Sequence, residues 1–347
     1  MKLLILTQKM DSSDSNLGFF HRWVEAFAKR CESIIVICLY EGTHNLPKNV
    51  RVMSLGKEEG VSRIKYLWRF YSYIWTYRAE YDNVFVHMNQ IYVVLGGLLW
   101  RLLNKRIGLW YAHGAVSFSL RLASIMTNSV FTSTTEGFRI DTKKRRVVGQ
   151  GIDTDLFTPK ENYTLVAPAR LVTLGRITPS KNIDMMIDTL AALLASGMSA
   201  TLDVVGSPDQ GNEGYLAVLR EHTRRAGLDN AVHFVGGVPY QELPKLLLGY
   251  DLFINAGKTG SLDKAVLDAA AAGLPVVSSN PATYTFLGGE GSVGGCDMTV
   301  KSLTDAVARV ISLNETDRAA FGAQFRRRVI EEHGLPRLVD LLLRELV

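Results

Sequence analysis

Residues 169–182 read ARLVTLGRITPSKN, an apolar run that ends at Gly175 and passes through two cations into a helical pattern. The apolar residues after this stretch recur three and four positions apart, which is the spacing of one helix face. They are Ile183, Met186, Ile187, Leu190 and Leu194. The stretch therefore predicts a strand, a tight loop and a helix, the unit from which parallel sheets are built.

The same alternation of short apolar runs and longer helical patterns extends along the chain in both directions. Candidate strands are residues 2–7, 33–39, 50–54, 83–87, 107–112, 129–132, 145–148, 169–174, 201–205, 231–235, 251–254 and 275–278. Helical patterns in the first half fall at about 18–30, 62–80, 91–104 and 117–127. The order predicts an α/β protein with parallel sheets in both halves.

At 347 residues, the chain exceeds the size at which one hydrophobic core usually stops growing. The polar stretch 153–168 contains Pro159 and is typical of a link between domains. We therefore predict an N-terminal domain over 1–158 and a C-terminal domain over 159–347. Residues 300–347 are almost entirely helical in pattern, and we expect the final helices to pack back on the N-terminal domain.

The composition is that of a globular protein, with 47% hydrophobic and 21% charged residues. The longest apolar run, 91–100, stops at Arg101 and is too short to cross a bilayer. The N-terminus lacks the apolar core of a signal peptide. Cys31, Cys38 and Cys296 have no metal-ligand spacing and are interpreted as reduced core residues. We expect a cytoplasmic protein.

The positive charge lies in the first half of the sequence. Residues 1–150 hold 21 Lys or Arg against 11 Asp or Glu, whereas the remainder holds 18 against 23. Within the first half, the segment 63–78 interleaves basic and aromatic residues over about four helical turns. A buried helix with basic ends and a helix lying on a membrane surface both fit this pattern. Stacking on nucleic acid uses the same residue types, but we expect no nucleic-acid partner.

The loop after the strand 169–174 is the first candidate binding element. Loops that follow strands of open α/β sheets are where ligands bind, and helix N-termini favour anions. Arg176 and Lys181 would add fixed positive charge for a diphosphate. The alternative is an ordinary loop with two solvated cations.

A second candidate loop, 255–264, follows the strand 251–254 and leads into an alanine-rich helical pattern. It is not a Walker A element, because Leu252 stands where the first glycine of that motif belongs. Its backbone amides are suited to anionic or hydroxyl-rich groups. Asp268 lies one helical turn after Lys264 and is a candidate acceptor for ribose hydroxyls.

These segments resemble the retaining glycosyltransferase family 4. The specific matches are Gly175 to Lys181, the run LDAAAAGLPVV at 267–277 and the run GIDTDLF at 151–157. The resemblance implies the GT-B fold, with two Rossmann-like domains whose parallel sheets face each other across a cleft. It also implies a nucleotide-diphosphate sugar as donor, and no required metal or other cofactor.

The resemblance implies roles for individual residues. In the family, the cations at Arg176 and Lys181 contact the donor diphosphate, and the acidic residue at Asp268 binds the ribose. Gly260 stands where the family carries its other acidic residue, and Asp263 with Lys264 is our candidate replacement for holding the sugar.

Two elements of the first half complete the expected site. His113 matches a family histidine beside the reacting sugar, and Gly18 matches a glycine loop near the phosphate. The candidate catalytic residues are His113, Arg176 and Lys181. The candidate donor-binding residues are Gly18, Gly175, Arg176, Lys181, Gly260, Ser261, Leu262, Asp263, Lys264 and Asp268.

The expected activity is transfer of a sugar, with retention of anomeric configuration, to a hydroxyl of a glycan or lipid-linked acceptor. Membrane contact through 63–78 and a location at the cytoplasmic membrane face are consistent with such an acceptor. Two alternatives stay open. One is a nucleotide-sugar epimerase, and the other is a non-catalytic protein that binds a nucleotide sugar without transferring it.

Overall fold

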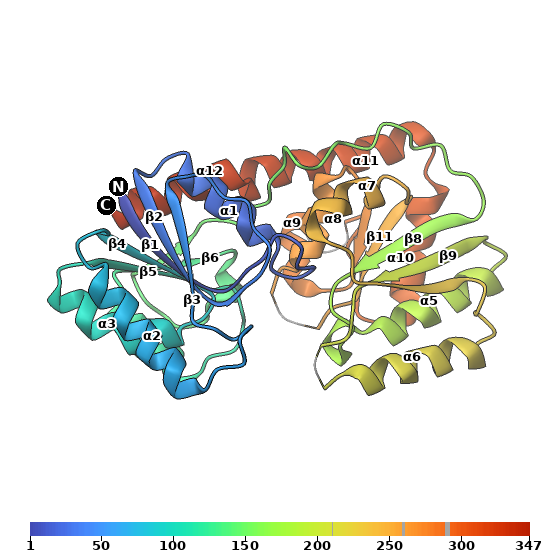
Figure 1. Cartoon of the computed structure of the whole chain (residues 1–347). Helices are drawn as coiled ribbons and strands as arrows, with labels where there is room; N and C mark the ends of the chain where they lie inside the picture. The colour runs from blue at the N-terminus through green and yellow to red at the C-terminus, as the bar shows by residue number, and fades with distance from the viewer. Residues whose placement is uncertain (210, 259–260, 289–291) are drawn as a thin grey trace. The chain divides into compact units, whose positions relative to one another are not determined.

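The computed structural model describes residues 1–209, 211–258, 261–288 and 292–347, which form two compact units (Figure 1). Unit 1 consists of Met1–Gly151, Pro239–Gln241 and His333–Val347, and unit 2 of Ile152–Val238 and Glu242–Glu332. The chain thus divides after Gly151, before the polar stretch around Pro159, and its last residues belong to unit 1.

Unit 1 is built on a seven-stranded parallel sheet with the order β3-β2-β1-β4-β5-β6-β7. Its strands are β1 (Lys2–Met10), β2 (Ser33–Glu41), β3 (Val50–Ser54), β4 (Asn83–His87), β5 (Arg106–Trp110), β6 (Ser129–Thr132) and β7 (Arg145–Val147). Its helices are α1 (Phe19–Ala28), α2 (Arg63–Thr76), α3 (Ile91–Leu102), α4 (Phe118–Met126) and α12 (Leu335–Leu346).

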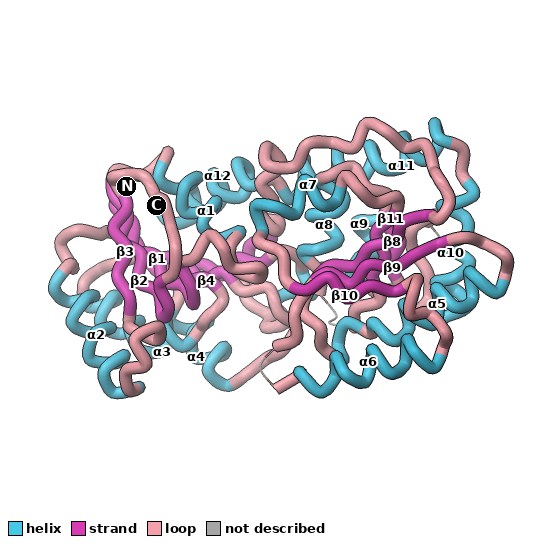
Figure 2. Tube along the Cα trace, turned by 45° about the vertical axis from the view of Figure 1, so that its right-hand side comes forward, coloured by secondary structure: helices cyan, strands magenta, loops and turns pink. Residues whose placement is uncertain are grey.

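The helices of unit 1 lie on both faces of its sheet. Helices α2, α3 and α4 cover one face, and α1 and α12 cover the other (Figures 1 and 2). Because both faces are covered, the central strands are mainly apolar, and all five residues of β4 are buried. Leu342 of α12 is completely buried, and a Cβ on Gly108 of β5 would meet Leu346 at 2.7 Å. The last helix is therefore part of the unit 1 core.

Unit 2 has a five-stranded parallel sheet with the order β10-β9-β8-β11-β12. Its strands are β8 (Ala169–Leu174), β9 (Ala200–Val205), β10 (Val232–Gly236), β11 (Leu252–Asn255) and β12 (Val276–Ser278). Its helices are α5 (Ile183–Ala195), α6 (Glu213–Arg225), α7 (Leu243–Leu247), α8 (Lys264–Ala271), α9 (Tyr284–Leu287), α10 (Val300–Ser312) and α11 (Glu315–Arg328).

The expected strands are confirmed, each with ends within three residues of the sequence estimate. The two parallel sheets of the predicted fold class are present as well. Cys31, Cys38 and Cys296 are buried and unbridged, as predicted for core residues. No helix in the described part of the chain is long and apolar enough to cross a bilayer.

Each sheet has one point at which the strand order reverses. In unit 2 the chain runs outward from β8 through β9 to β10, then returns to place β11 on the other side of β8. The loops that leave β8 and β11 therefore diverge, and ligands of open α/β sheets bind at this place. The corresponding reversal in unit 1 lies between β1 and β4. The two candidate loops of the sequence follow β8 and β11.

Candidate functional site

The loop after β8 passes close to the end of β9. A Cβ on Gly206 would lie only 1.8 Å from the carbonyl oxygen of Gly175, and both glycines have positive φ angles. The amides of Gly175 and Ile177 donate to the carbonyls of Val205 and Ser207. Those of Lys181 and Asn182 donate within the loop. These four amides are therefore already paired and are not available to a phosphate.

Lys181 joins the two candidate loops. Its Nζ donates to Oδ1 of Asp263 at 2.6 Å, and the side chains of both residues are largely buried. The amide of Lys258 also donates to the carbonyl of Ser180. The side chain of Lys181 passes over Gly175, where a Cβ would be 3.4 Å from its Cε. A cation is thereby held at the carboxyl ends of β8 and β11.

A chain of buried polar side chains fixes the carboxylate of Asp263. Asn255, the last residue of β11, donates to Oδ2 of Asp263 at 2.9 Å. Ser278 at the end of β12 donates to the amide oxygen of Asn255 at 3.0 Å. Gly257 is required beside them, because a Cβ there would lie 2.6 Å from the same carboxylate. Asp263 is thus positioned by two neighbouring strands.

Asn280 secures the second loop from the other side. Its side-chain amide donates to the carbonyl of Ser261 at 3.0 Å, and its backbone amide donates to Ser278 Oγ. Ser261 and Leu262 are buried in this loop. Asn255 lies in the predicted loop 255–264 but was not assigned a role, and Ser278 and Asn280 were not predicted as site residues. Their signal was the placement of a polar residue directly after an apolar strand run.

Lys264 and Asp268 form an ion pair along the first turn of α8. Lys264 Nζ donates to both carboxylate oxygens of Asp268, at 2.7 and 2.8 Å. Burial lowers the pKa of Lys264, while the charges of Asp268 and Asp153 act in the opposite direction. In this conformation the Asp268 carboxylate, which was expected to bind the ribose, is already paired with Lys264. The i, i+4 spacing on a helix was the sequence signal for this pair.

Arg176 differs from the two lysines because its side chain is exposed. Its Nη1 donates to Oδ2 of Asp209, which follows β9, at 2.6 Å. All three cations of the candidate site are therefore paired with aspartates. A diphosphate that binds here must displace these carboxylates from the cations. Gly260 lies outside the described residues.

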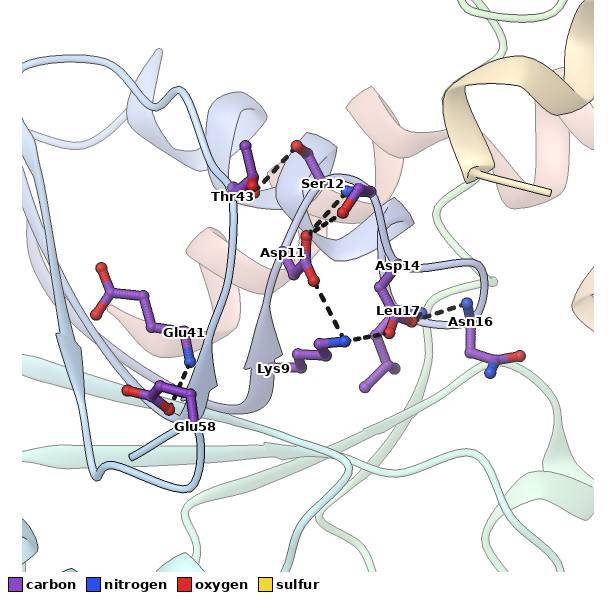
Figure 3. A network of polar contacts seen from close by, with 10 residues as sticks. Lys9, Asp11, Ser12, Asp14, Asn16, Leu17, Glu41, Thr43 and Glu58 are labelled. Atoms are coloured by element: carbon purple, nitrogen blue, oxygen red, sulfur yellow. Dashed lines mark hydrogen bonds and ion pairs between the residues drawn. The ribbon is translucent and has the colours of Figure 1, made fainter. Parts of the chain in front are cut away.

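In unit 1 the loop after β1 is built differently from a glycine-rich loop. Lys9 Nζ contacts Asp11 at 3.2 Å and Asp14 at 2.5 Å (Figure 3). Burial acts to lower the pKa of Lys9, but the two carboxylates outweigh it, so that the pKa is raised. The amide of Gly18 donates to the carbonyl of Asp14, and a Cβ on Gly18 would meet that oxygen at 2.4 Å. Gly18 thus serves close packing inside the loop.

His113 follows β5 and is exposed. Its Nδ1 accepts from the amide of Ala115 at 3.1 Å, so that Nε2 carries the proton of the neutral ring. His87, at the end of β4, is fully buried and stacks on Phe20 and Trp110. Burial lowers the pKa of His87 to about 3. His113 is the one of these two histidines that a ligand can reach.

Within the described residues, no three His, Cys, Asp or Glu side chains are grouped so that they could hold a metal ion. The structure brings together Gly175, Lys181 and Asp263. The Lys264–Asp268 pair lies on the helix that follows Asp263. Gly18 and His113 belong to unit 1.

One segment of the chain matches a known protein family. Residues 168–312, which contain both candidate loops, match the family model described as glycosyl transferases group 1. This segment, which makes up less than half of the chain, is therefore similar to that family of transferases.

The chain is also similar to individual glycosyltransferases of bacteria. The chain is 30% identical over 197 residues to a GDP-mannose-dependent α-(1-6)-phosphatidylinositol monomannoside mannosyltransferase of Mycobacterium tuberculosis. It is 27% identical over 178 residues to a lipopolysaccharide core biosynthesis mannosyltransferase of Rhizobium meliloti. The matches cover 52% and 47% of this chain and 49% of each relative. The chain thus spans about half the length of the curated relatives it matches.

The whole chain resembles a solved structure in fold. HepE of Anabaena, crystallised with UDP and glucose, superposes with a TM-score of 0.77 at 17% identity. The match covers 100% of this chain and 99% of that one. The fold is the GT-B fold of glycosyltransferases, as predicted.

Proposed function

We propose that this protein transfers a sugar from a nucleotide-diphosphate donor to a hydroxyl group of a glycan or lipid-linked acceptor, with retention of anomeric configuration. The observation that carries the proposal is the buried Lys181–Asp263 pair at the strand-order reversal of unit 2, inside the segment that matches the family. The name of the GDP-mannose-dependent relative supports a nucleotide-sugar donor. The names of both mannosyltransferase relatives support an envelope glycolipid or glycan as the acceptor class.

In the proposed reaction, the bond between the anomeric carbon and the diphosphate oxygen breaks. A bond forms to the acceptor oxygen on the same face of the sugar, and the acceptor proton leaves with the diphosphate. Arg176 and Lys181 stabilise the negative charge that develops on the leaving diphosphate. Since two cationic side chains perform this task, the proposed reaction requires no metal ion, and a chelator should leave its rate unchanged.

His113 is proposed to orient the sugar or the acceptor through its protonated Nε2. Asp263 is proposed to hold a sugar hydroxyl once the diphosphate has drawn Lys181 away. Asp268 is proposed to accept from the ribose, in competition with Lys264. These roles require the three ion pairs to rearrange when the donor binds.

The pairing of Asp268 with Lys264 favours one alternative, a protein that binds a nucleotide sugar without transferring it. Both oxygens of the carboxylate assigned to ribose are occupied by the same cation. Such a protein would be stabilised by a nucleotide but would release no product. The epimerase alternative would return a nucleotide sugar with an altered sugar.

The test is an assay with a panel of nucleotide sugars and with envelope lipids or oligosaccharides as acceptors. We expect one donor to release its nucleoside diphosphate together with a glycosylated product, whose anomeric configuration is read by NMR. R176A should lower the rate about a hundredfold. Nucleotide binding without product, an altered free nucleotide sugar, or a product with inverted configuration would each contradict the proposal.

A further inference from the structure

Helices α2, α3 and α4 expose large apolar side chains. The three lie side by side on one face of the unit 1 sheet (Figures 1 and 2). Tyr71 of α2 donates to the carbonyl of Leu95 in α3 at 3.0 Å, and Gly97 of α3 lies against Met126 of α4. Within the described residues, every exposed aromatic side chain belongs to α2 or α4.

Aliphatic side chains extend this surface across all three helices. Trp68 is 68% exposed, Leu102 73% and Phe118 83%. The apolar helix surface, as we call it, consists of Ile64, Leu67, Trp68, Tyr71, Trp75, Ile91, Leu98, Leu102, Phe118 and Ile125. A groove of about 660 Å³ runs along α2 and is lined almost entirely by apolar side chains of this surface and by Leu99. Patches of this kind on a folded protein mark interaction sites.

The charge on the same helices has only one sign. α2, α3 and α4 contain Arg63, Lys65, Arg69, Arg101 and Arg121 and no Asp or Glu. Arg69 forms a bidentate ion pair with Glu59 of the preceding loop. Within the described residues, the other four cations form no ion pair. The partner of this surface must therefore supply both apolar contact and negative charge.

We propose that the apolar helix surface docks on a membrane that contains anionic lipid. A bilayer offers acyl chains to Ile64, Leu98 and Leu102 and phosphate groups to the cations that flank them. The rings of Trp68 and Trp75 suit the headgroup region, where amphipathic rings gather. Arg78, which lies 4.4 Å over the ring of Trp75, adds charge at the end of α2.

Two other occupants fit the surface less well. A second copy of the chain would place like charges opposite one another, because the three helices supply no carboxylate. A nucleic acid would satisfy the cations and stack on the rings, but it would leave the exposed aliphatic side chains without an apolar partner. The proposal concerns unit 1 alone and does not depend on the donor site.

The test is sedimentation of the full chain with vesicles of phosphatidylcholine, with and without phosphatidylserine. Wild-type protein should bind the anionic vesicles, and R63Q/K65Q should lower the partition coefficient about tenfold. L98E/L102E should lower it at least as much. The matched control is K29Q/K48Q, which removes two exposed cations elsewhere in unit 1 and should bind almost like the wild type.

Quenching of tryptophan fluorescence by bromine-labelled phospholipid provides a second readout. Of the five tryptophans, Trp23, Trp100 and Trp110 are buried, so that quenching would report on Trp68 and Trp75. Binding to anionic vesicles without quenching would overturn the proposal, as would equal binding by R63Q/K65Q. The proposal would also be overturned if the wild-type chain did not bind vesicles but formed a dimer that L98E dissociates. Binding of a single-stranded nucleic acid in place of vesicles would overturn it as well.

Discussion

Asp263 determines how much positive charge the candidate donor site offers. Its carboxylate contacts Lys181 and would repel an incoming diphosphate. We therefore predict that D263N binds nucleoside diphosphates about fivefold more tightly, measured by calorimetry. Its turnover should nevertheless fall if Asp263 then holds the sugar. The control D305N removes an exposed carboxylate of the same unit. Weaker diphosphate binding by D263N would show that Asp263 mainly positions Lys181.

His87 couples the stability of unit 1 to pH. Its pKa is about 3 in the folded chain and about 6.5 in the unfolded chain, so that only the unfolded chain binds this proton between these values. The contribution of neutral His87 to the free energy of unfolding is thus retained above about pH 6.5 and is lost as the pH falls below it. We predict a loss of about 2 kcal/mol between pH 6.5 and 5.

H87F should remove this loss, because a phenyl ring keeps the stacking on Phe20 and Trp110 but cannot be protonated. The measurement is urea unfolding of both proteins at the two pH values. An equal loss of stability in H87F and wild type would contradict the assignment.

At the residue scale, the sequence predicted which candidate loops lie together better than it predicted the contacts within them. Gly175, Lys181 and Asp263 were named from their positions after apolar runs, and the structure brings them together. The pairing itself was not foreseen, because it joins residues from two different strand-to-helix loops. Such contacts depend on strand order, which sequence periodicity does not specify.

At the scale of elements, the end of β9 controls the loop that follows β8. Gly206 has a φ of +150°, and a Cβ there would lie 1.8 Å from the carbonyl oxygen of Gly175. G206A should therefore destabilise the protein by about 3 kcal/mol and disturb the Lys181 loop. G214A is the matched control, since a Cβ there meets nothing within 4 Å. It should stabilise α6 by up to about 1 kcal/mol. Similar urea midpoints for the two variants would contradict this interpretation of the strand end.

The strands were predictable because each is a short apolar run bounded by polar or glycine residues. The helix that follows Lys181 was predictable from its apolar spacing, yet its start was not. Asn182 adopts a left-handed conformation, with a φ of +55°, between a short 3-10 turn at Pro179–Lys181 and α5. Local backbone geometry of this kind has no clear periodic signal.

At the scale of the whole molecule, the C-terminal helix stabilises the first unit. A π-helical turn, Val329–His333, leads into α12, whose Leu342 is completely buried in unit 1. We predict that L342A lowers the free energy of unfolding by about 3 kcal/mol while leaving nucleoside diphosphate affinity within about twofold. Loss of nucleotide binding in folded L342A would show that α12 contributes to the donor site.

Unit 2 is proposed to hold a nucleoside diphosphate through Arg176 and Lys181. The most direct measurement is protection against thermal unfolding by a panel of nucleoside diphosphates and their sugars, for wild type and for R176A. Because a ligand of the folded state must raise its apparent stability, we predict a shift with one base that is largely lost in R176A. The absence of a shift with any nucleotide, or an undiminished shift in R176A, would contradict the claim.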